Sequence, residues 1–149
     1  MGPLFEIVTA YFQQQKWTIE AATDRPVLRL PFEHKGEVWT CYAEVREEQH
    51  RVVFYTVPAI IVPEAQRRAM AELIARANYG LAVGNLELDF GDGELRCKTS
   101  IDVTGDRLTH ALIHQLVVIN LRLVRHYLPA VKSVLAGLSP FDAISRAGG

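Results

Sequence analysis

The sequence predicts an α+β fold, in which one antiparallel sheet packs against helices in the order αβββαββαα. Apolar residues recur at helical spacing near both ends of the chain, and they alternate with polar residues in between. The pairs Lys35-Gly36 and Asp92-Gly93 mark tight turns between alternating segments. We expect a single domain over residues 1–144 and a flexible tail over residues 145–149.

Composition argues against several classes of protein. The 149 residues are 49% hydrophobic and 22% charged, which is typical of a globular domain and not of a disordered chain. The net charge of −1 offers no basic surface for nucleic acid or for an anionic membrane. The N-terminus lacks the pattern of a signal peptide, and Cys41 and Cys97 are too few for a disulfide framework. We therefore expect a cytoplasmic protein with no nucleic-acid partner and no membrane partner.

The first part of the chain predicts one helix and three strands. Residues 3–15 have the spacing of an amphipathic helix, and strands are expected over residues 27–34, 37–46 and 51–59. A two-residue turn at Lys35-Gly36 places the apolar residues of the first two strands on one inward face. That face holds Leu28, Leu30, Phe32, Trp39, Cys41, Ala43 and Val45.

The second hairpin predicts another apolar surface on the opposite side of the sheet. A symmetric loop over residues 47–50 gives the pairs Val45–Val52, Ala43–Phe54 and Cys41–Thr56. The outward face then carries five apolar or aromatic residues, more than a face meant only for water would hold. They are Val38, Tyr42, Val53, Tyr55 and Val57. Either another helix of this chain covers this stripe or a second molecule does, and these residues are our candidate protein-binding site.

The middle of the chain predicts a helix and a further hairpin. The helix opens at Val62-Pro63-Glu64 and ends near Asn78-Tyr79-Gly80, where Gly80 suits the position just after a helix. Asp92-Gly93 is the preferred pair for a type I′ turn between two strands. In that register the charged pairs are Asp89–Arg96 and Glu87–Lys98, and the apolar face pairs Phe90–Leu95, Leu88–Cys97 and Leu86–Thr99.

A long helix is predicted over residues 109–128, with Thr109 or Asp106 as its N-cap. Pro129 is expected to end or kink this helix, a shorter helix continues to Gly137, and Ser139-Pro140 starts a last turn. Asn120 falls in the apolar sector of the long helix, where a buried amide must find partners. We expect it to hydrogen-bond a backbone group or to fix a helix contact.

No set of residues predicts a metal site, a cofactor or catalysis. His110 and His114 have the spacing of two zinc ligands, but nothing supplies the others, so we interpret both as solvent-facing. The loop over residues 89–94 has turn chemistry rather than the ligand pattern of a calcium or phosphate site. Ser100 and Asp102 share the polar face of a strand, with no histidine tied to them by spacing. We expect no cofactor, no metal and no enzymatic activity, and we expect both cysteines to be buried and unpaired.

Several segments in this order resemble the bacterial YbjN-like domain family. They are residues 39–43, 46–49, 78–80, 84–89, 92–96, 99–103 and 127–129. Members of the family often have proline after the threonine that opens the long helix, whereas His110 follows Thr109 here. The resemblance implies a fold similar to that of type III secretion chaperones and a non-enzymatic protein-interaction module, described as a regulator of sensory or signal transduction. It brings no established catalytic residues.

Two classes of function remain open. The first is a chaperone-like or regulatory adaptor in bacterial sensory or stress signalling, a homodimer that holds a protein or peptide partner by apolar burial or by adding a strand to an open sheet edge. The second is a small-ligand sensor or an unrecognised enzyme with a pocket between helices and sheet. An enclosed pocket with convergent polar groups favours the second class, and an exposed apolar patch without one favours the first.

Overall fold

The structure is a computed structural model that describes residues 1–148. Over these residues the sheet has six antiparallel strands in the order β1-β2-β3-β4-β6-β5. The strands are β1 (Glu20–Ala21), β2 (Val27–His34), β3 (Glu37–Arg46), β4 (Arg51–Pro58), β5 (Asn85–Leu88) and β6 (Leu95–Asp102). The helices are α1 (Pro3–Gln14), α2 (Arg67–Asn78), α3 (His110–Leu135) and α4 (Pro140–Arg146), with single 3₁₀ turns η1 (Glu47–Gln49) and η2 (Glu64–Gln66). The α+β class and the order of the main elements are confirmed.

Two details differ from the sequence-based expectation at the ends of the chain. The two-residue strand β1 pairs with β2 and was not predicted. Helix α4 includes Ser145 and Arg146, the first two residues of the segment expected to be a tail, while Gly149 lies outside the described residues. Within the described part of the chain, none of the helices combines the length and the apolar composition that a bilayer crossing requires.

Strands β2, β3 and β4 pair in the register that the sequence predicts. His34 lies opposite Glu37, and Val45 lies opposite Val52. Lys35 has φ 49° and Gly36 has φ 80°, the geometry of a type I′ turn, whose twist matches that of the flanking strands. The predicted inward face of these strands is buried throughout, apart from the partly exposed Phe32.

The register predicted for the β5–β6 hairpin is wrong by two residues. Glu87 lies opposite Arg96 rather than Lys98, and Leu88 lies opposite Leu95. Asp92-Gly93 therefore belongs to a wider loop over residues 89–94 and not to a two-residue turn. Because side chains alternate with a period of two, the shift leaves the side chains of β5 and β6 on their predicted faces. The predicted pair Phe90–Leu95 is wrong, since Phe90 lies in the loop and is 54% exposed.

Contacts with a distant segment hold this wider loop. The Gly93 carbonyl accepts a hydrogen bond from the Val62 amide at 2.9 Å, and Arg67 donates to the carbonyls of Val62 and Phe90. Gly93 has φ +82°, and a Cβ at this position would lie 2.3 Å from the Val62 carbonyl oxygen. The loop thus closes against the chain just before α2, at a point where only glycine fits.

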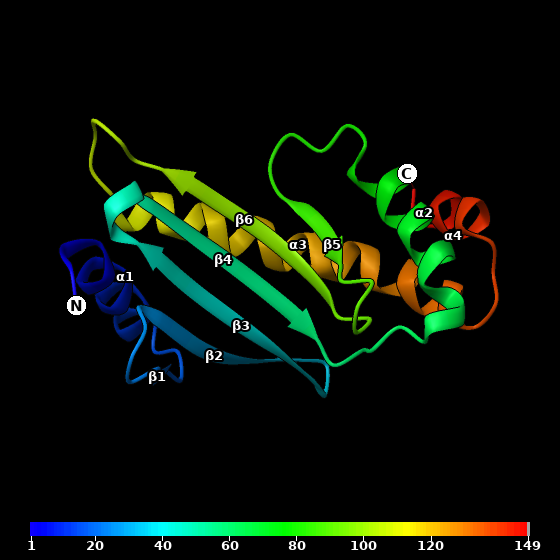
Figure 1. The fold of residues 1–149 in the computed structure, drawn as a ribbon, viewed down its shortest axis with the longest axis horizontal. Coiled ribbons are helices and arrows are strands. Elements are labelled where there is room, and N and C mark those ends of the chain that lie inside the picture. The colour runs from blue at the N-terminus through cyan, green and yellow to red at the C-terminus, as the bar shows by residue number, and fades with distance from the viewer. Residues whose placement is uncertain (149) are drawn as a thin grey trace.

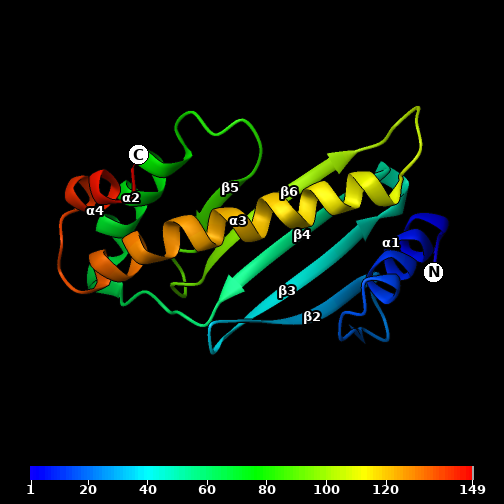
Figure 2. The same ribbon diagram turned by 180° about the vertical axis from the view of Figure 1, so that it is seen from behind.

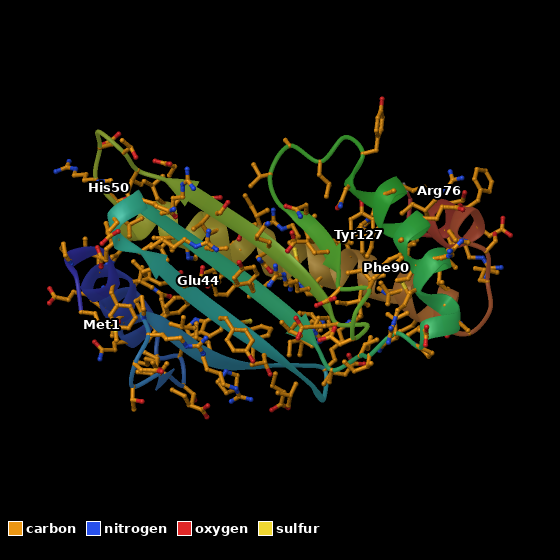
Figure 3. All side chains as sticks on the ribbon, viewed as in Figure 1. Met1, Glu44, His50, Arg76, Phe90 and Tyr127 are labelled. Atoms are coloured by element: carbon orange, nitrogen blue, oxygen red, sulfur yellow. The ribbon has the colours of Figure 1, made fainter. Side chains whose placement is uncertain are left out.

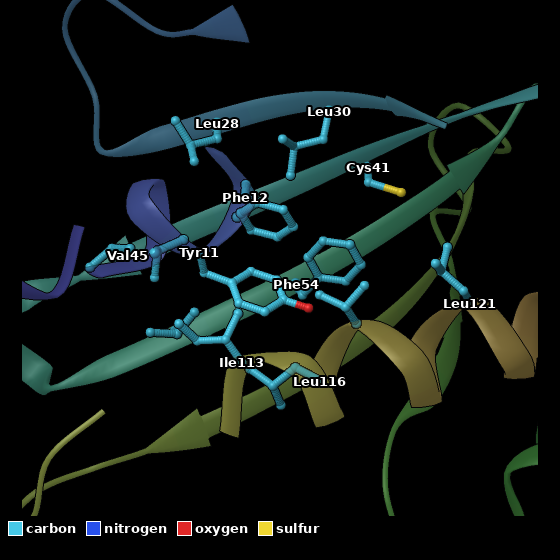
Figure 4. Packing of buried hydrophobic residues seen from close by; sticks show 14 of the residues in the cluster. Tyr11, Phe12, Leu28, Leu30, Cys41, Val45, Phe54, Ile113, Leu116 and Leu121 are labelled. Carbon is cyan, nitrogen blue, oxygen red and sulfur yellow. The ribbon is translucent and has the colours of Figure 1, made fainter. Parts of the chain in front are cut away.

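Helices cover one face of the sheet, as Figure 2 shows, with α3 lying along β4 and β6 and α1 lying beside it. In the core between these layers, Tyr11 and Phe12 of α1 meet Phe54 of β4 and the α3 residues Ile113 and Leu116 (Figure 4). The rings of Phe12 and Phe54 stack with their centroids 6.0 Å apart. Burial of these large side chains is the main source of stability for the fold.

A buried polar cluster fastens α3 to the sheet. Asn120 is fully buried, and its Nδ2 donates to the carbonyls of Phe54 (2.9 Å) and Cys97 (3.1 Å) and to the Thr99 hydroxyl (3.2 Å). The Thr99 hydroxyl in turn donates to the Leu116 carbonyl at 2.8 Å. The prediction that Asn120 bonds the backbone and fixes a helix contact is confirmed.

Helix α3 begins where the sequence predicts but continues further. The Thr109 hydroxyl caps its start by accepting a hydrogen bond from the Leu112 amide at 3.2 Å. Pro129 lies inside the helix, which runs without interruption to Leu135, so the expected separate shorter helix is wrong. A proline removes one helical hydrogen bond. The turns around it bury Ala130 and Val131 in a second core cluster with α2 and α4, and this burial offsets the loss.

Helix α1 is held at its first turn by a distant carboxylate. The amides of Leu4 and Phe5 donate to the two carboxylate oxygens of Glu47, at 3.1 and 2.9 Å. This contact satisfies two of the N–H groups that a helix start leaves free, and it places a negative charge at the positive end of the helix dipole. The turn between β3 and β4 therefore positions α1.

The two histidines of α3 hold the other end of α1. His114 Nδ1 lies 2.7 Å from the Tyr11 hydroxyl, and His110 Nδ1 lies 3.1 Å from Gln14 Oε1. Both histidines are exposed, as predicted, but they also make contacts between helices that the sequence analysis did not foresee. Among residues 1–148 no group of three or more potential ligands is arranged to hold a metal ion.

Candidate protein-binding surface

The outward face of the sheet carries no helix over residues 1–148, so that β3, β4 and β6 lie in front of α3 in Figure 1. In Figure 3 Glu44 marks this face toward the end of β3, where it lies opposite Val53 of β4. The sequence alone left two explanations for the apolar stripe, a covering helix of the same chain or a second molecule. Among residues 1–148, no helix covers the stripe.

The structure brings four of the five predicted residues together at the centre of this face. Tyr42 lies directly opposite Tyr55 on the next strand, and Val53 and Val57 flank Tyr55 on β4 with Glu44 and Thr40 as their partners. Val38 lies on the same face but near the start of β3, opposite Glu33 of β2. The stripe is thus a compact group of four with Val38 at one end.

Exposure differs along the stripe. Val53 is only 5% exposed and Val38 is 54% exposed, whereas Tyr42, Tyr55 and Val57 are half-buried. Since no helix lies above Val53, the side chains that bury it are its neighbours on the same face. The two half-buried tyrosines lie in the centre of the sheet, and tyrosine is a residue type that often anchors protein–protein contacts.

A stacked arginine extends the tyrosine pair toward β6. The Arg96 guanidinium lies 4.3 Å from the centroid of the Tyr55 ring, a cation–π contact. Its Nε donates to Glu87 at 2.7 Å, and Lys98 Nζ donates to the other oxygen of the same carboxylate at 2.8 Å. Burial alone would raise the pKa of Glu87, but the hydrogen bonds from Lys98 and Arg96 outweigh it and lower that pKa. Glu87 therefore holds Arg96 in place against Tyr55.

Ion pairs lie around the stripe on the same face of the sheet. Arg46 contacts Glu44 at 2.7 Å, Arg51 contacts Asp102 at 3.0 Å, and Arg29 contacts Glu20 at 2.6 Å. Hydrogen bonds from Thr104, together with the Arg51 guanidinium, lower the pKa of Asp102 to about 2. An apolar and aromatic centre with a charged rim is the usual anatomy of a protein–protein interface.

Two hollows in this face share Tyr55 as a wall. One, of about 250 Å³, is lined by Tyr42, Val57 and Arg96 among others, and the second, of about 270 Å³, by Val53 and Lys98 among others. Each hollow is large enough to receive a side chain from another protein. Tyr55 is therefore the central residue of the surface.

The stacking of Arg96 on Tyr55 is the feature that sequence reasoning missed. In the sequence analysis Arg96 was paired only within the β5–β6 hairpin, opposite Asp89, and the pairing of β6 with β4 was not predicted. The observed register places Lys98 opposite Tyr55 on β4 and Arg96 opposite Glu87 on β5. The available signal was that Arg96 and Tyr55 fall on the same outward face of strands that become neighbours.

The region between helices and sheet offers little room for a ligand. A cavity of about 30 Å³ lies there, with apolar walls that include Ile74, Leu86, Val124 and Leu128. That volume holds about one or two water molecules. Cys41 and Cys97 are both buried and unpaired, as predicted, and burial raises the pKa of each thiol to about 12.

Comparison with known proteins identifies relatives. The family model YbjN, described as "Putative bacterial sensory transduction regulator", matches residues 5–133. A search of curated proteins found no significant match.

Solved structures share the fold at low sequence identity. The crystal structure of YbjN from E. coli is similar with a TM-score of 0.61 and 13% identity, covering 80% of this chain and 84% of that one. A chain of the HopA1–SchA chaperone–effector complex has a TM-score of 0.54 and 15% identity, covering 82% and 91%. A chain of the ExsC–ExsE complex has a TM-score of 0.53 and 10% identity, covering 80% and 86%. The fold is thus also similar to that of type III secretion chaperones.

Proposed function

The chain belongs to the YbjN family, and from that premise we propose that it is a non-enzymatic protein-interaction module, chaperone-like or regulatory, in bacterial sensory signalling. Its first partner is a second copy of itself, held against the uncovered sheet face. A cytoplasmic location suits two buried, unpaired thiols, since a reducing compartment keeps cysteines free.

The observation that carries this proposal is the pair Tyr42 and Tyr55 on a sheet face without a helix. Half-buried aromatic rings between hollows, with ion pairs around them, favour an interface over a surface that stays solvated. A two-fold homodimer uses the same patch on both copies, so Tyr42 and Tyr55 would contribute twice. Two of the solved structures with this fold are complexes, one described as a chaperone with its effector.

A small-ligand sensor or an enzyme is less well supported. Such a function needs an enclosed site with convergent polar groups, whereas the cavity between helices and sheet is about 30 Å³ and apolar. We therefore assign the activity to the surface and not to the interior.

The test is Tyr42→Glu, measured by sedimentation and by circular dichroism. A charge at the centre of an apolar contact should weaken self-association by at least about tenfold, while the domain stays folded because Tyr42 faces away from the core. Ala111→Glu is the matched control, because Ala111 is exposed on α3 on the opposite side of the molecule.

The result that contradicts the proposal is a folded variant that associates as strongly as the wild type. A wild-type protein that remains monomeric at high concentration would also contradict the homodimer. Unfolding of Tyr42→Glu would show that the stripe is part of the core and that the interface lies elsewhere.

A further inference from the structure

One half of β6 has a neighbouring strand on only one side. Strand β4 pairs along β6 as far as Asp102, which lies opposite Arg51. On the other side, β5 pairs only with residues 95–98, so that residues 99–102 have no strand beside them among residues 1–148. Figure 1 shows this free stretch between the loop that precedes β5 and the loop that follows β6.

The main-chain groups of Ser100 and Asp102 point toward this free edge. In an antiparallel ladder alternate residues bond to opposite neighbours. The Val103 amide donates to the His50 carbonyl of the β4 side, and the Asp89 amide donates to the Glu94 carbonyl of the β5 side. Odd-numbered residues of β6 therefore bond to β4. Ser100 and Asp102, both exposed, present their N–H and C=O groups outward.

The other edges of the sheet are each partly blocked to an added strand. Pro31 of β2 has no N–H to offer, and β1 pairs with part of the same edge. On the outer side of β5, the side-chain amide of Asn78 donates to the Leu86 carbonyl at 2.9 Å and accepts from the Leu86 amide at 2.8 Å. Proteins commonly protect edges in these ways, so an unprotected stretch of β6 is informative.

An apolar flank of α3 lies above the free edge. Leu112, Leu116, Ile119 and Leu123 share this flank by helical spacing, and the Leu116 carbonyl accepts from Thr99 of β6. Toward the C-terminus the flank is covered by the loop before β5. Gly84 of this loop lies so close to Leu123 that a Cβ at position 84 would be only 2.9 Å from Leu123 Cδ1. Toward the N-terminus, Leu112 is 36% exposed and Ile119 is half-buried.

We propose that the free half of the β6 edge binds an extended segment of a partner protein as an added strand. The segment continues the line of β5 and hydrogen-bonds to the main chain of Ser100 and Asp102. Its alternate side chains are apolar, because one side of an added strand faces Leu112 and Ile119, and the other alternate side chains are polar because they face solvent. This edge borders the sheet face of the proposed function, since the side chains of Ser100 and Asp102 also line the hollow beside Tyr55. The segment bonds to the main chain of these two residues, whereas the homodimer contact is centred on Tyr42 and Tyr55.

A single segment fits this edge better than a second copy does. The free stretch covers only residues 99–102 and lies between two loops (Figure 1). One extended chain needs the width of a single strand, whereas a second copy would bring its own helix α3 and both loops alongside. The occupant is therefore a short linear segment.

In the experiment, a display library of random linear peptides is selected for binding to the 149-residue protein. A selected peptide is then synthesised, and its affinity for the protein is measured. We expect selected sequences that alternate apolar and polar residues, and slower amide hydrogen exchange at Ser100 and Asp102 when the peptide is bound. Ser100→Pro removes one outward N–H and obstructs the edge, so it should weaken peptide binding about tenfold or more. Ser100→Ala keeps the N–H and should bind as the wild type, as should Tyr42→Glu.

Peptides that bind without slowing exchange at Ser100 and Asp102, or a selection that yields no binder, would overturn the proposal. Protection of these amides by raising the protein concentration without peptide would assign the edge to a second copy and overturn it as well. Should Ser100→Pro not fold, Ile119→Glu takes its place with Ala111→Glu as the control. Equal peptide affinity of those two variants would count against the proposal.

Discussion

The amide of Asn120 on α3 donates a hydrogen bond to the hydroxyl of Thr99 on β6, 3.2 Å away, and Thr99 donates in turn to the Leu116 carbonyl one turn earlier on the helix. The same amide reaches the carbonyls of Phe54 on β4 and Cys97 on β6. Because apolar contacts alone would let a helix slide on a sheet, these directed bonds fix the position of α3 along β4 and β6.

Asn120→Asp should therefore be much more harmful than its small change in shape suggests. An ionised aspartate only accepts hydrogen bonds, yet it would face the carbonyls of Phe54 and Cys97. We expect a loss of at least about 3 kcal/mol in the free energy of unfolding at neutral pH, against about 2 kcal/mol for Asn120→Ala. Urea denaturation of both variants measures the difference.

The defect of Asn120→Asp should also lessen in acid. Burial raises the pKa of a carboxyl, and a group whose pKa is raised in the folded state binds protons on folding, so stability increases as the pH falls. Asn120→Ala has no such group and serves as the control. Equal stability of the two variants at every pH would contradict a donor role for Asn120.

The contact between His114 and Tyr11 should be worth more than its exposed position suggests. A sequence view of His114 as a solvent-facing residue implies a change within about 0.5 kcal/mol for His114→Ala. The 2.7 Å contact to the Tyr11 hydroxyl instead predicts a coupling of about 1 kcal/mol between His114→Ala and Tyr11→Phe in a double-mutant cycle. Gln115→Ala, exposed on the same helix, is the control and should couple to neither. A coupling near zero would show that the contact is not stabilising.

The two cysteines should react slowly in the native protein. Cys41 and Cys97 are almost completely inaccessible, and burial raises the pKa of each thiol to about 12, so the reactive thiolate is scarce at neutral pH. Labelling with a thiol reagent, followed by mass spectrometry, should modify both only after unfolding in denaturant. Rapid native labelling of either thiol would mean that its strand opens readily.

The register of β2, β3 and β4 was predictable because two independent signals agree there. Lys35-Gly36 fixes a two-residue turn, and the alternation of apolar residues gives the same pairing. At β5–β6 only the turn signal was strong. The pair Asp92-Gly93 is favourable for a two-residue turn, and that turn implied the wrong register. The actual loop is fixed by Val62 and Arg67, which are distant in the sequence, so local turn preference could not reveal it.

The sequence was sufficient to predict which residues of β3 and β4 share the candidate surface, but not the contact of Arg96 or the exposure of the face. Tyr42 and Tyr55 follow from the alternation of β3 and β4, which sequence shows directly. The contact between Arg96 and Tyr55 depends on the pairing of β4 with β6, and the exposure of the face depends on where α3 lies. The continuation of α3 beyond Pro129 could not be predicted locally either. It is stabilised by the burial of Ala130 and Val131 against α2 and α4, which depends on the tertiary fold.

Asp102 provides a pH test of the rim around the stripe. Hydrogen bonds from Thr104, together with Arg51, lower its pKa to about 2, against about 3.9 for an unfolded aspartate. A group with a lowered pKa contributes its stability above the unfolded value, and this contribution is lost as the pH falls from about 4 toward 2. The gap in the free energy of unfolding between the wild type and Asp102→Asn should therefore shrink across that range.

The direct measurement for Asp102 is an NMR titration of its side-chain carboxyl. We expect a midpoint near 2, and a rise toward the unfolded value in Arg51→Ala, because that variant removes the guanidinium 3.0 Å from the carboxylate. Added salt should raise the midpoint in the wild type, since the ion pair is half-exposed and is screened, and should change it less in Arg51→Ala. A midpoint near 4 in the wild type would mean that neither the hydrogen bonds from Thr104 nor the Arg51–Asp102 pair persists in solution. The charged rim around Val53 and Tyr55 would then lack one of its fixed members.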